Sequence, residues 1–143
     1  MNKRLWLYAS LASIALVGCA TAGGQKVMTV QECHGNCKVD ITITGNCDFG
    51  VPDTVKMKLP LGRKKITWEI MSGNYIFAAN GIAFKTDTSG VFEQPELSPN
   101  GKRFVWDDNH TQSGSSPYEY AINVIRTGPN PGVCTKDPFI VNE

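Results

Sequence analysis

The chain has 143 residues, with 14 Lys and Arg against 13 Asp and Glu, and 41% of its residues are hydrophobic. This nearly neutral balance argues against a nucleic-acid-binding protein, because such proteins are usually strongly basic. The length fits one ordinary domain and is too short for two.

The N-terminus has the order of a secretory signal. Lys3 and Arg4 precede an apolar run over residues 5–17, and a small residue stands before Cys19. The apolar run is shorter than the roughly 20 residues that a membrane-spanning helix needs. The sequence Leu16-Val17-Gly18-Cys19 resembles the lipobox of bacterial lipoproteins.

The lipobox resemblance implies that residues 1–18 are removed and that Cys19 becomes the first residue, carrying a thioether-linked diacylglycerol and an acylated amine. Stable anchoring needs more than one acyl chain, and a multiply acylated cysteine meets that need. Ala20 stands where inner-membrane lipoproteins carry a retention aspartate, so the resemblance implies an outer-membrane lipoprotein. Whether the domain faces the periplasm or the cell surface stays open.

After the signal, residues 19–31 are expected to form a lipidated, flexible tether, and residues 32–143 a single domain. The signal takes two of the 14 basic residues, Lys3 and Arg4, and none of the 13 acidic ones. The processed chain is therefore close to neutral. The composition does not change along the rest of the chain, which favours one domain on one tether.

Beyond the tether, apolar and polar residues alternate with period two, which is the pattern of half-buried strands. We expect strands over residues 38–44, 54–59, 65–70, 75–79, 82–85, 103–106, 118–124 and 139–141, with a tight turn at Asn80-Gly81. No window has the pattern of an amphipathic helix. The predicted fold is an all-β, single β-sandwich, immunoglobulin-like or a similar Greek key, of about seven or eight short strands.

Besides Cys19 the chain has four cysteines, and an even set in an exported protein predicts two disulfides. The strand over residues 38–44 separates Cys37 from Cys47 by roughly 30 Å, which is too far for a bond between them. We favour Cys33–Cys37 with Cys47–Cys134, and the alternative is Cys33–Cys47 with Cys37–Cys134. A metal site on Cys33, His34 and Cys37 is less favoured, because exported cysteines usually pair with each other.

Three motifs of the second half resemble a broad group of small exported proteobacterial β-sandwich proteins that end D-P-x-I-x-N. They are Phe104-Val105-Trp106-Asp107-Asp108-Asn109, Tyr118-Glu119-Tyr120 and Asp137-Pro138-Phe139-Ile140-Val141-Asn142. The resemblance covers residues 66–142. It implies the sandwich fold, and the group carries no activity to transfer.

Two groups of charged residues are candidate binding residues. The first is a run of basic residues without an acid among them: Lys56, Lys58, Arg63, Lys64 and Lys65. On neighbouring strands they would form a basic patch for an anionic partner, such as lipopolysaccharide, a cell-wall polymer or an acidic protein face. The alternative is that these lysines keep the domain soluble and protect a sheet edge.

The second group is Asp107, Asp108, Asn109 and His110, which we expect in a long loop that runs to Ser116. Converging oxygen ligands would suit calcium, but Asp and Asn in a loop more often cap their own backbone, and that interpretation is favoured. The chain has no G-x-S-x-G nucleophile motif. No catalytic residue, metal or cofactor is predicted.

The sequence thus predicts a non-catalytic binding or scaffolding module, held at the outer membrane by its lipid, whose partner is an envelope protein or polymer. The alternative function is inhibition of a lysozyme-type peptidoglycan hydrolase. Residues 112–116 followed by Tyr118 resemble the S-G-x-x-Y loops of lysozyme inhibitors, with one additional residue before the tyrosine.

Overall fold

The computed structural model describes residues 28–143 except residues 59, 111–113 and 115. The expected signal, Cys19 and most of the expected tether lie outside the described residues. Among the residues that are described, no helix has the length and apolar character needed to cross a membrane. The first strand begins at Val30, so the expected tether over residues 19–31 overlaps the folded part by two residues.

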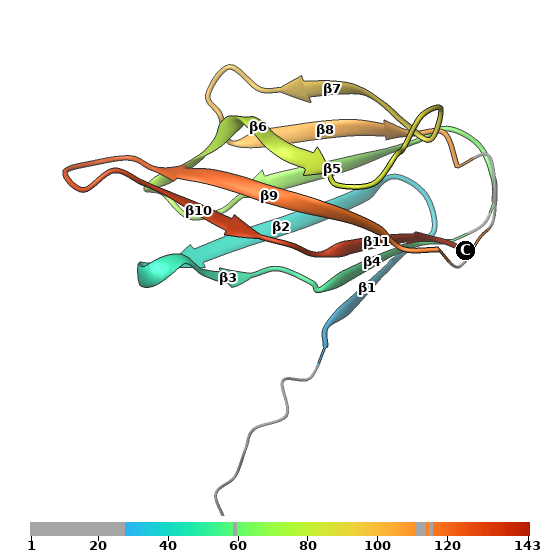
Figure 1. The fold of residues 1–143 in the computed structure, drawn as a ribbon, viewed down its shortest axis with the longest axis horizontal. Coiled ribbons are helices and arrows are strands. Elements are labelled where there is room, and N and C mark those ends of the chain that lie inside the picture. The colour runs from blue at the N-terminus through green and yellow to red at the C-terminus, as the bar shows by residue number, and fades with distance from the viewer. Residues whose placement is uncertain (1–27, 59, 111–113, 115) are drawn as a thin grey trace, which may run out of the picture.

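Eleven strands and one short 3-10 turn make up the described part of the chain, and the strands form two sheets packed face to face (Figure 1). The elements are β1 (Val30–Cys33), β2 (Cys37–Thr44), η1 (Gly45–Cys47), β3 (Asp48–Gly50), β4 (Thr54–Met57), β5 (Lys64–Ile70), β6 (Tyr75–Phe84), β7 (Phe92–Leu97), β8 (Arg103–Asp108), β9 (Tyr118–Arg126), β10 (Gly132–Lys136) and β11 (Phe139–Asn142). The predicted all-β sandwich is therefore confirmed.

Both sheets mix parallel and antiparallel pairs. The first has the order β1-β4-β11-β9-β10, with β6 also paired to β9, and the second has the order β3-β2-β5-β8-β7. Strand β4 pairs in parallel with β1 and β11, and β2 pairs in parallel with β5. The expected strands over residues 75–79 and 82–85 form the single strand β6, and four further strands, β1, β3, β7 and β10, have no clear alternation and were not expected.

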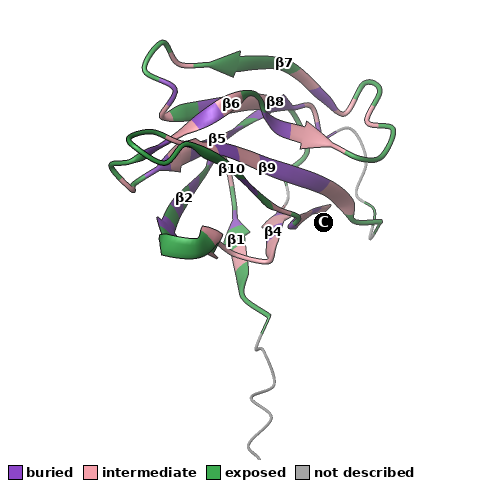
Figure 2. Ribbon diagram, turned by 60° about the vertical axis from the view of Figure 1, so that its left-hand side comes forward, coloured by how far each residue is buried: buried purple, intermediate pink, exposed green. Residues whose placement is uncertain are grey.

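The period-two pattern puts apolar side chains between the sheets, as the buried stretches of the inner strands show in Figure 2. In β2 every second residue is buried, from Cys37 to Ile43. Trp68 on β5 and Tyr120 on β9 are fully buried and join the two sheets, because the indole Nε1 donates to the tyrosine hydroxyl at 3.2 Å. Burial of this kind is the main stabilising contribution to such a domain.

The two favoured disulfides, Cys33–Cys37 and Cys47–Cys134, are both present. The first joins β1 to β2, and the second joins η1 to β10. Each bond therefore links one sheet to the other, at opposite ends of the sandwich (Figure 1).

The expected turn at Asn80-Gly81 is wrong. Strand β6 runs through both residues, and its register with β9 shifts between Phe77 and Ile82. A Cβ atom on Gly81 would lie 2.7 Å from the Cβ of Phe77 and 3.0 Å from Cδ2 of Phe104. The glycine therefore permits a close approach of β6 to the opposite sheet, and a strand irregularity is the other common use of Asn-Gly.

Candidate functional site

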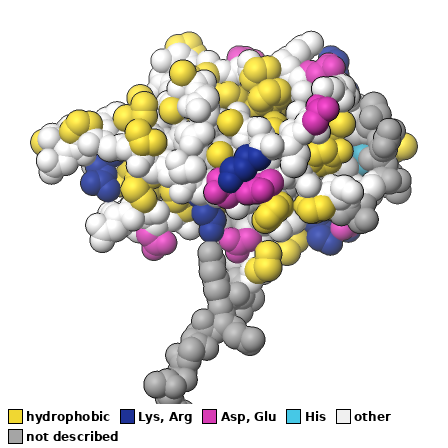
Figure 3. Space-filling view, viewed as in Figure 1, with side chains coloured by type: hydrophobic (Ala, Val, Ile, Leu, Met, Phe, Trp, Pro, Cys, Tyr) yellow, Lys and Arg dark blue, Asp and Glu magenta, His cyan; other side chains and the backbone are white. Residues whose placement is uncertain are grey.

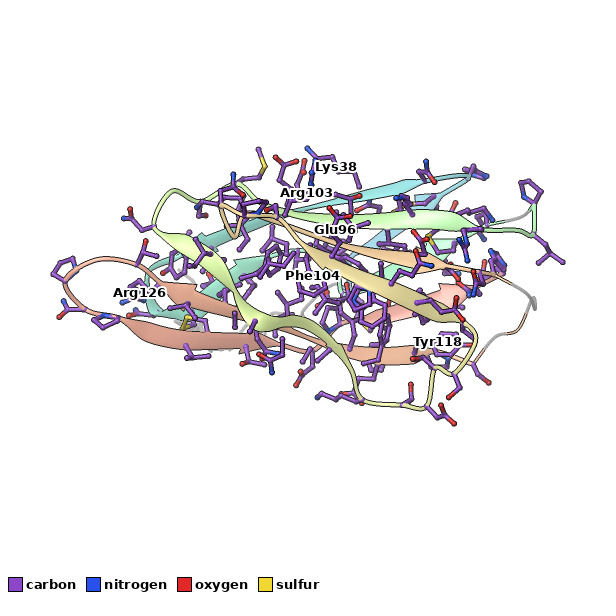
Figure 4. All side chains as sticks on the ribbon, turned by 90° about the horizontal axis from the view of Figure 1, so that it is seen from above. Lys38, Glu96, Arg103, Phe104, Tyr118 and Arg126 are labelled. Atoms are coloured by element: carbon purple, nitrogen blue, oxygen red, sulfur yellow. A yellow bond between two sulfur atoms is a disulfide. The ribbon has the colours of Figure 1, made fainter. Side chains whose placement is uncertain are left out.

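The two ends of the sandwich carry different chemistry. At one end β5, β8 and β11 bring together Lys64, Asp108, His110 and Asn142, which we call the polar centre. At the other end the β5–β6 turn and the β9–β10 hairpin surround an open pocket that contains Arg126, which we call the arginine pocket. Figure 4 labels Arg126 near the hairpin end and Tyr118 toward the opposite end.

The basic run does not form the single exposed patch that the sequence suggested. Lys56 and Lys58 lie on one side of β4, as expected, and both bind the carboxylate of Glu143. The hydrogen bond to Glu143 raises the pKa of Lys58, and the bonds from Lys56 and Lys58 lower the pKa of Glu143. On the face shown in Figure 3, basic and acidic groups likewise lie next to one another. Lys58 also lies 3.5 Å from the carboxylate of Glu32, so two carboxylates balance these two lysines within the domain.

Lys64 and Lys65 lie on β5 of the opposite sheet and Arg63 directly precedes that strand, which is the reason the run is divided. Arg63 and Lys65 flank the carboxylate of Asp107, at 3.7 and 3.9 Å. Arg63 Nε also donates to Asn109 Oδ1 at 3.2 Å. Because β5 and β8 are antiparallel with Lys65 opposite Asp107, the two candidate groups meet and partly offset each other's charge.

The prediction that residues 107–110 lie in a long loop is wrong for its first two residues. Asp107 and Asp108 are the last residues of β8, and only Asn109 of the four is more than slightly exposed. Asp108 and His110 are fully buried. Asp108 Oδ1 accepts hydrogen bonds from the backbone N–H of His110 at 2.9 Å and from Asn142 Nδ2 at 3.2 Å.

Lys64 closes the polar centre from β5. Its ammonium donates to the carbonyls of Lys58 and Pro60, and it lies 3.1 Å from Nδ1 of His110. Since an ammonium only donates, Nδ1 accepts and the ring proton is on Nε2. Lys64 is buried, so it cannot contribute to a surface patch.

Burial shifts the pKa values of Asp108 and His110 in opposite directions. It raises the pKa of Asp108, although the hydrogen bonds from His110 and Asn142 work against that change. Burial, helped by the charge of Lys64, lowers the pKa of His110. His110 Nε2, Asp108 Oδ2 and Asn142 Oδ1 are buried and have no hydrogen-bond partner among the described residues. The centre is thus a buried polar group inside the sandwich.

Metal ligands do not gather in the part of the chain that the structure describes. No three His, Cys, Asp or Glu side chains there come close enough to hold an ion. The cysteines of the Cys33–Cys37 turn are bonded to each other.

The loop of the inhibitor hypothesis lies mostly outside the described residues, because residues 112, 113 and 115 are not described. Gly114 donates its backbone N–H to the carbonyl of Asn142 at 3.0 Å. The ring of Tyr118 is half-buried and packs edge-on against Phe92, with centroids 5.1 Å apart. The inhibitor function stays a prediction.

The arginine pocket has a volume of about 550 Å³, which exceeds the hollows of about 390 Å³ beside Trp106 and about 380 Å³ beside Arg103. Its lining comes from the end of β2, η1, the β5–β6 turn and the β9–β10 hairpin: Ile43, Gly45, Ser72, Gly73, Asn74, Tyr75, Arg126, Thr127, Pro129 and Asn130. This size falls in the range of small-ligand sites, which is about 300–1,000 Å³.

Arg126 is held in place by Tyr75. Its Nε donates to the tyrosine hydroxyl at 3.2 Å, and its guanidinium carbon lies 5.6 Å from the ring centroid. Tyr75 is itself buried and donates to the carbonyl of Thr44 at 3.3 Å. The guanidinium therefore has a fixed position at the pocket, while its terminal amino groups make no hydrogen bond or ion pair to the described side chains.

A second cation lies behind the wall of the pocket. The ammonium of Lys102 donates to the carbonyls of Ser72 at 2.8 Å, Gly73 at 2.9 Å and Tyr75, and burial lowers the pKa of Lys102. These bonds fix the β5–β6 turn, which forms one side of the pocket. The ammonium of Lys102 also adds positive charge close to the pocket.

No sequence pattern singled out Arg126 as a candidate. It stands alone at the end of β9, in no charged run, and its partner Tyr75 is 51 positions away. The available signals are the position of an arginine at the end of a predicted strand and the turn residues Gly128-Pro129-Asn130 after it.

In comparisons with known proteins, the sequence matches no family model and no curated protein.

Proposed function

We propose that this protein is an outer-membrane lipoprotein whose sandwich is a non-catalytic binding module of the cell envelope. The lipobox and the small residue before Cys19 support the anchor. Two disulfides in a domain of this size are typical of an oxidising compartment outside the cytoplasm, which supports export.

The observation that carries the binding function is the contrast between the two ends. The groups with the most reactive chemistry, Lys64, Asp108 and His110, are buried and bonded to one another. The accessible hollow at the other end is lined by both polar and apolar groups, and it contains an arginine whose terminal amino groups have no partner among the described side chains. A preformed pocket with a few convergent polar groups is the usual form of a small-ligand site.

The anchor is tested by Cys19→Ser in the natural host. We expect loss of acyl labelling and release of the protein from the membrane fraction, because the thiol is the site of acylation. Ala20→Asp is the companion variant, and it should keep the label while moving the protein to the inner membrane. Persistent membrane binding of an unlabelled Cys19→Ser protein would show that the signal has been misinterpreted.

The binding function is tested with a photocrosslinking amino acid in living cells. Placed at Asn130, an exposed residue of the arginine pocket, it should give an adduct of defined mass. Placed at His34, which is exposed at the opposite end, it should give none. Equal adducts at both positions, or none at Asn130, would contradict a binding role for the pocket.

A further inference from the structure

We propose that the arginine pocket binds an organic carboxylate, which Arg126 holds end-on with its two terminal amino groups. This inference rests on the proposed binding function and names the ligand class.

Two of the three nitrogen atoms of the Arg126 guanidinium are available to a ligand. Nε is used by the hydroxyl of Tyr75, and the aromatic ring lies against the guanidinium. The two terminal amino groups remain, and their spacing matches the two oxygens of a carboxylate. Because Tyr75 fixes the guanidinium in advance, the ligand would not have to order this side chain on binding.

The charge distribution favours an anion at this pocket. No Asp or Glu is among the described residues that line it. Elsewhere on the described surface most cations already have a carboxylate partner within 4 Å: Lys38, Lys56, Lys58, Arg63, Lys65, Lys85 and Lys136. Arg126 has none among the described residues, and Lys102 reinforces its charge from behind the turn.

The remaining lining indicates what accompanies the carboxylate. The side chains of Asn74, Thr127 and Asn130 are exposed and make no hydrogen bond to other described residues. They can donate to and accept from hydroxyl or amide groups of a ligand. Ile43 and Pro129 supply apolar surface beside them. This set suits the acidic end of a hydrophilic molecule, such as an acidic sugar or the C-terminus of a short peptide, and in both the carboxylate is the shared group.

The disulfide Cys47–Cys134 keeps the pocket in shape. It joins η1, which supplies Gly45 to one wall, to β10, which follows the hairpin that supplies Pro129 and Asn130 to another. The pocket therefore does not depend on noncovalent packing alone to hold these two walls at a fixed separation.

The test is a calorimetric or NMR titration of the full-length protein in a neutral detergent. The probes are glucuronic acid, N-acetyl-Ala-Ala and inorganic phosphate, with glucose and N-acetyl-Ala-Ala amide as the uncharged counterparts of the two carboxylates. We expect one or both carboxylates to bind with a dissociation constant of roughly 1 mM or below, and the uncharged counterparts at least about tenfold more weakly.

Four variants link that binding to the pocket. Arg126→Met should abolish carboxylate binding, and Arg126→Lys should weaken it because a point charge replaces the two-pronged donor. Asn130→Asp, a change on the exposed hairpin, should weaken it by charge repulsion without disturbing packing. Arg103→Met is the matched control, because Arg103 is exposed, has no ion pair among the described residues and should leave binding unchanged.

The proposal is overturned if neither carboxylate binds, if phosphate alone binds, or if the carboxylate affinity is equal in Arg126→Met and in the unaltered protein. Its failure is distinct from failure of the proposed function. A protein that gives the Asn130 adduct in cells but binds neither carboxylate keeps its binding role and loses only this ligand class.

Discussion

The polar centre and the arginine pocket show two ways in which one small sandwich treats its charges. At the polar centre, Lys64, Asp108 and His110 are taken out of water and bonded to each other and to the backbone. At the arginine pocket, Arg126 is fixed by one aromatic side chain and remains open to the solvent. The charges of the polar centre contribute to folding, and the charge of Arg126 is available to a ligand. Substitutions in the polar centre should therefore change the free energy of unfolding, and substitutions in the arginine pocket should change ligand binding.

Each end also has its own disulfide, and removing them should give the largest effect. The bond Cys47–Cys134 closes a separation of 87 residues, while Cys33–Cys37 closes only 4. Loop-closure entropy then predicts a loss of about 4–5 kcal/mol for Cys47→Ala with Cys134→Ala, against about 2 kcal/mol for the pair at the polar end. Urea unfolding measures both, and equal losses would contradict an entropic origin.

The second effect concerns the polar centre. Asp108→Ala removes the acceptor of Asn142 and of the His110 backbone, so we expect the free energy of unfolding to fall by about 3 kcal/mol. The matched control is Asp137→Ala, which removes an exposed ion pair to Lys85 and should change it by less than about 1 kcal/mol. Similar losses in the two variants would mean that the centre contributes no more than a surface pair.

The third effect is a pH dependence that arises in the polar centre between pH 7 and pH 5. The pKa of His110 is lowered in the fold by burial and by Lys64, so the unfolded chain takes up a proton first as the pH falls below about 6.5. Stability is therefore full above that pH and decreases toward pH 5, by up to about 1.4 kcal/mol per pH unit. The raised pKa of Asp108 acts in the opposite sense, because the fold then retains a proton more readily than the unfolded chain.

His110→Gln isolates this contribution from that of Asp108. The variant should unfold more easily at pH 7 and show a smaller decrease in stability between pH 7 and pH 5. His34→Gln, at an exposed position on the same end, should keep the slope of the unaltered protein. An unchanged slope in His110→Gln would assign the pH dependence to other groups.

The smallest effect on stability is expected at the arginine pocket. Arg126→Met loses one hydrogen bond and the contact with the Tyr75 ring, and its free energy of unfolding should change by no more than about 1 kcal/mol. Thermal unfolding with and without a bound carboxylate gives the measurement. A ligand-induced rise in melting temperature that disappears in Arg126→Met, at little cost in stability, is the outcome that separates the two ends.

Much of the fold could be predicted from the local alternation of apolar and polar residues. The alternation from Ile66 to Ile70 identified β5, and the long strand between the cysteines excluded one disulfide pairing. Prediction failed where tertiary contacts decide: Asn80-Gly81 has the composition of a turn, yet the glycine is needed because Phe77 and Phe104 press against it. Strand β1 is defined only by its parallel neighbour β4, which no local pattern reveals.

The candidate site was harder to predict than the fold. The charged residues 107–110 were recognised, but their burial depends on β5, which pairs with β8, and on Asn142 of β11 in the opposite sheet, so a solvated loop was expected where a strand end is found. Arg126 and Tyr75 come together only because β6 and β9 are antiparallel neighbours, with these two residues opposite each other in register. Such pairs can be recovered once strand register is known.

The way in which β1 enters the domain determines how the protein would respond to mechanical load. Thr29 is hydrogen-bonded to Asp53 and Thr54, and β1 continues in parallel beside β4 as far as Cys33. Tension that arrives from the N-terminal side would strain these bonds together, in shear. Any peeling would then stop at Cys33, because its disulfide transfers the force to β2 in the opposite sheet. A domain tied to a membrane at this point could be pulled on without unravelling from its first strand.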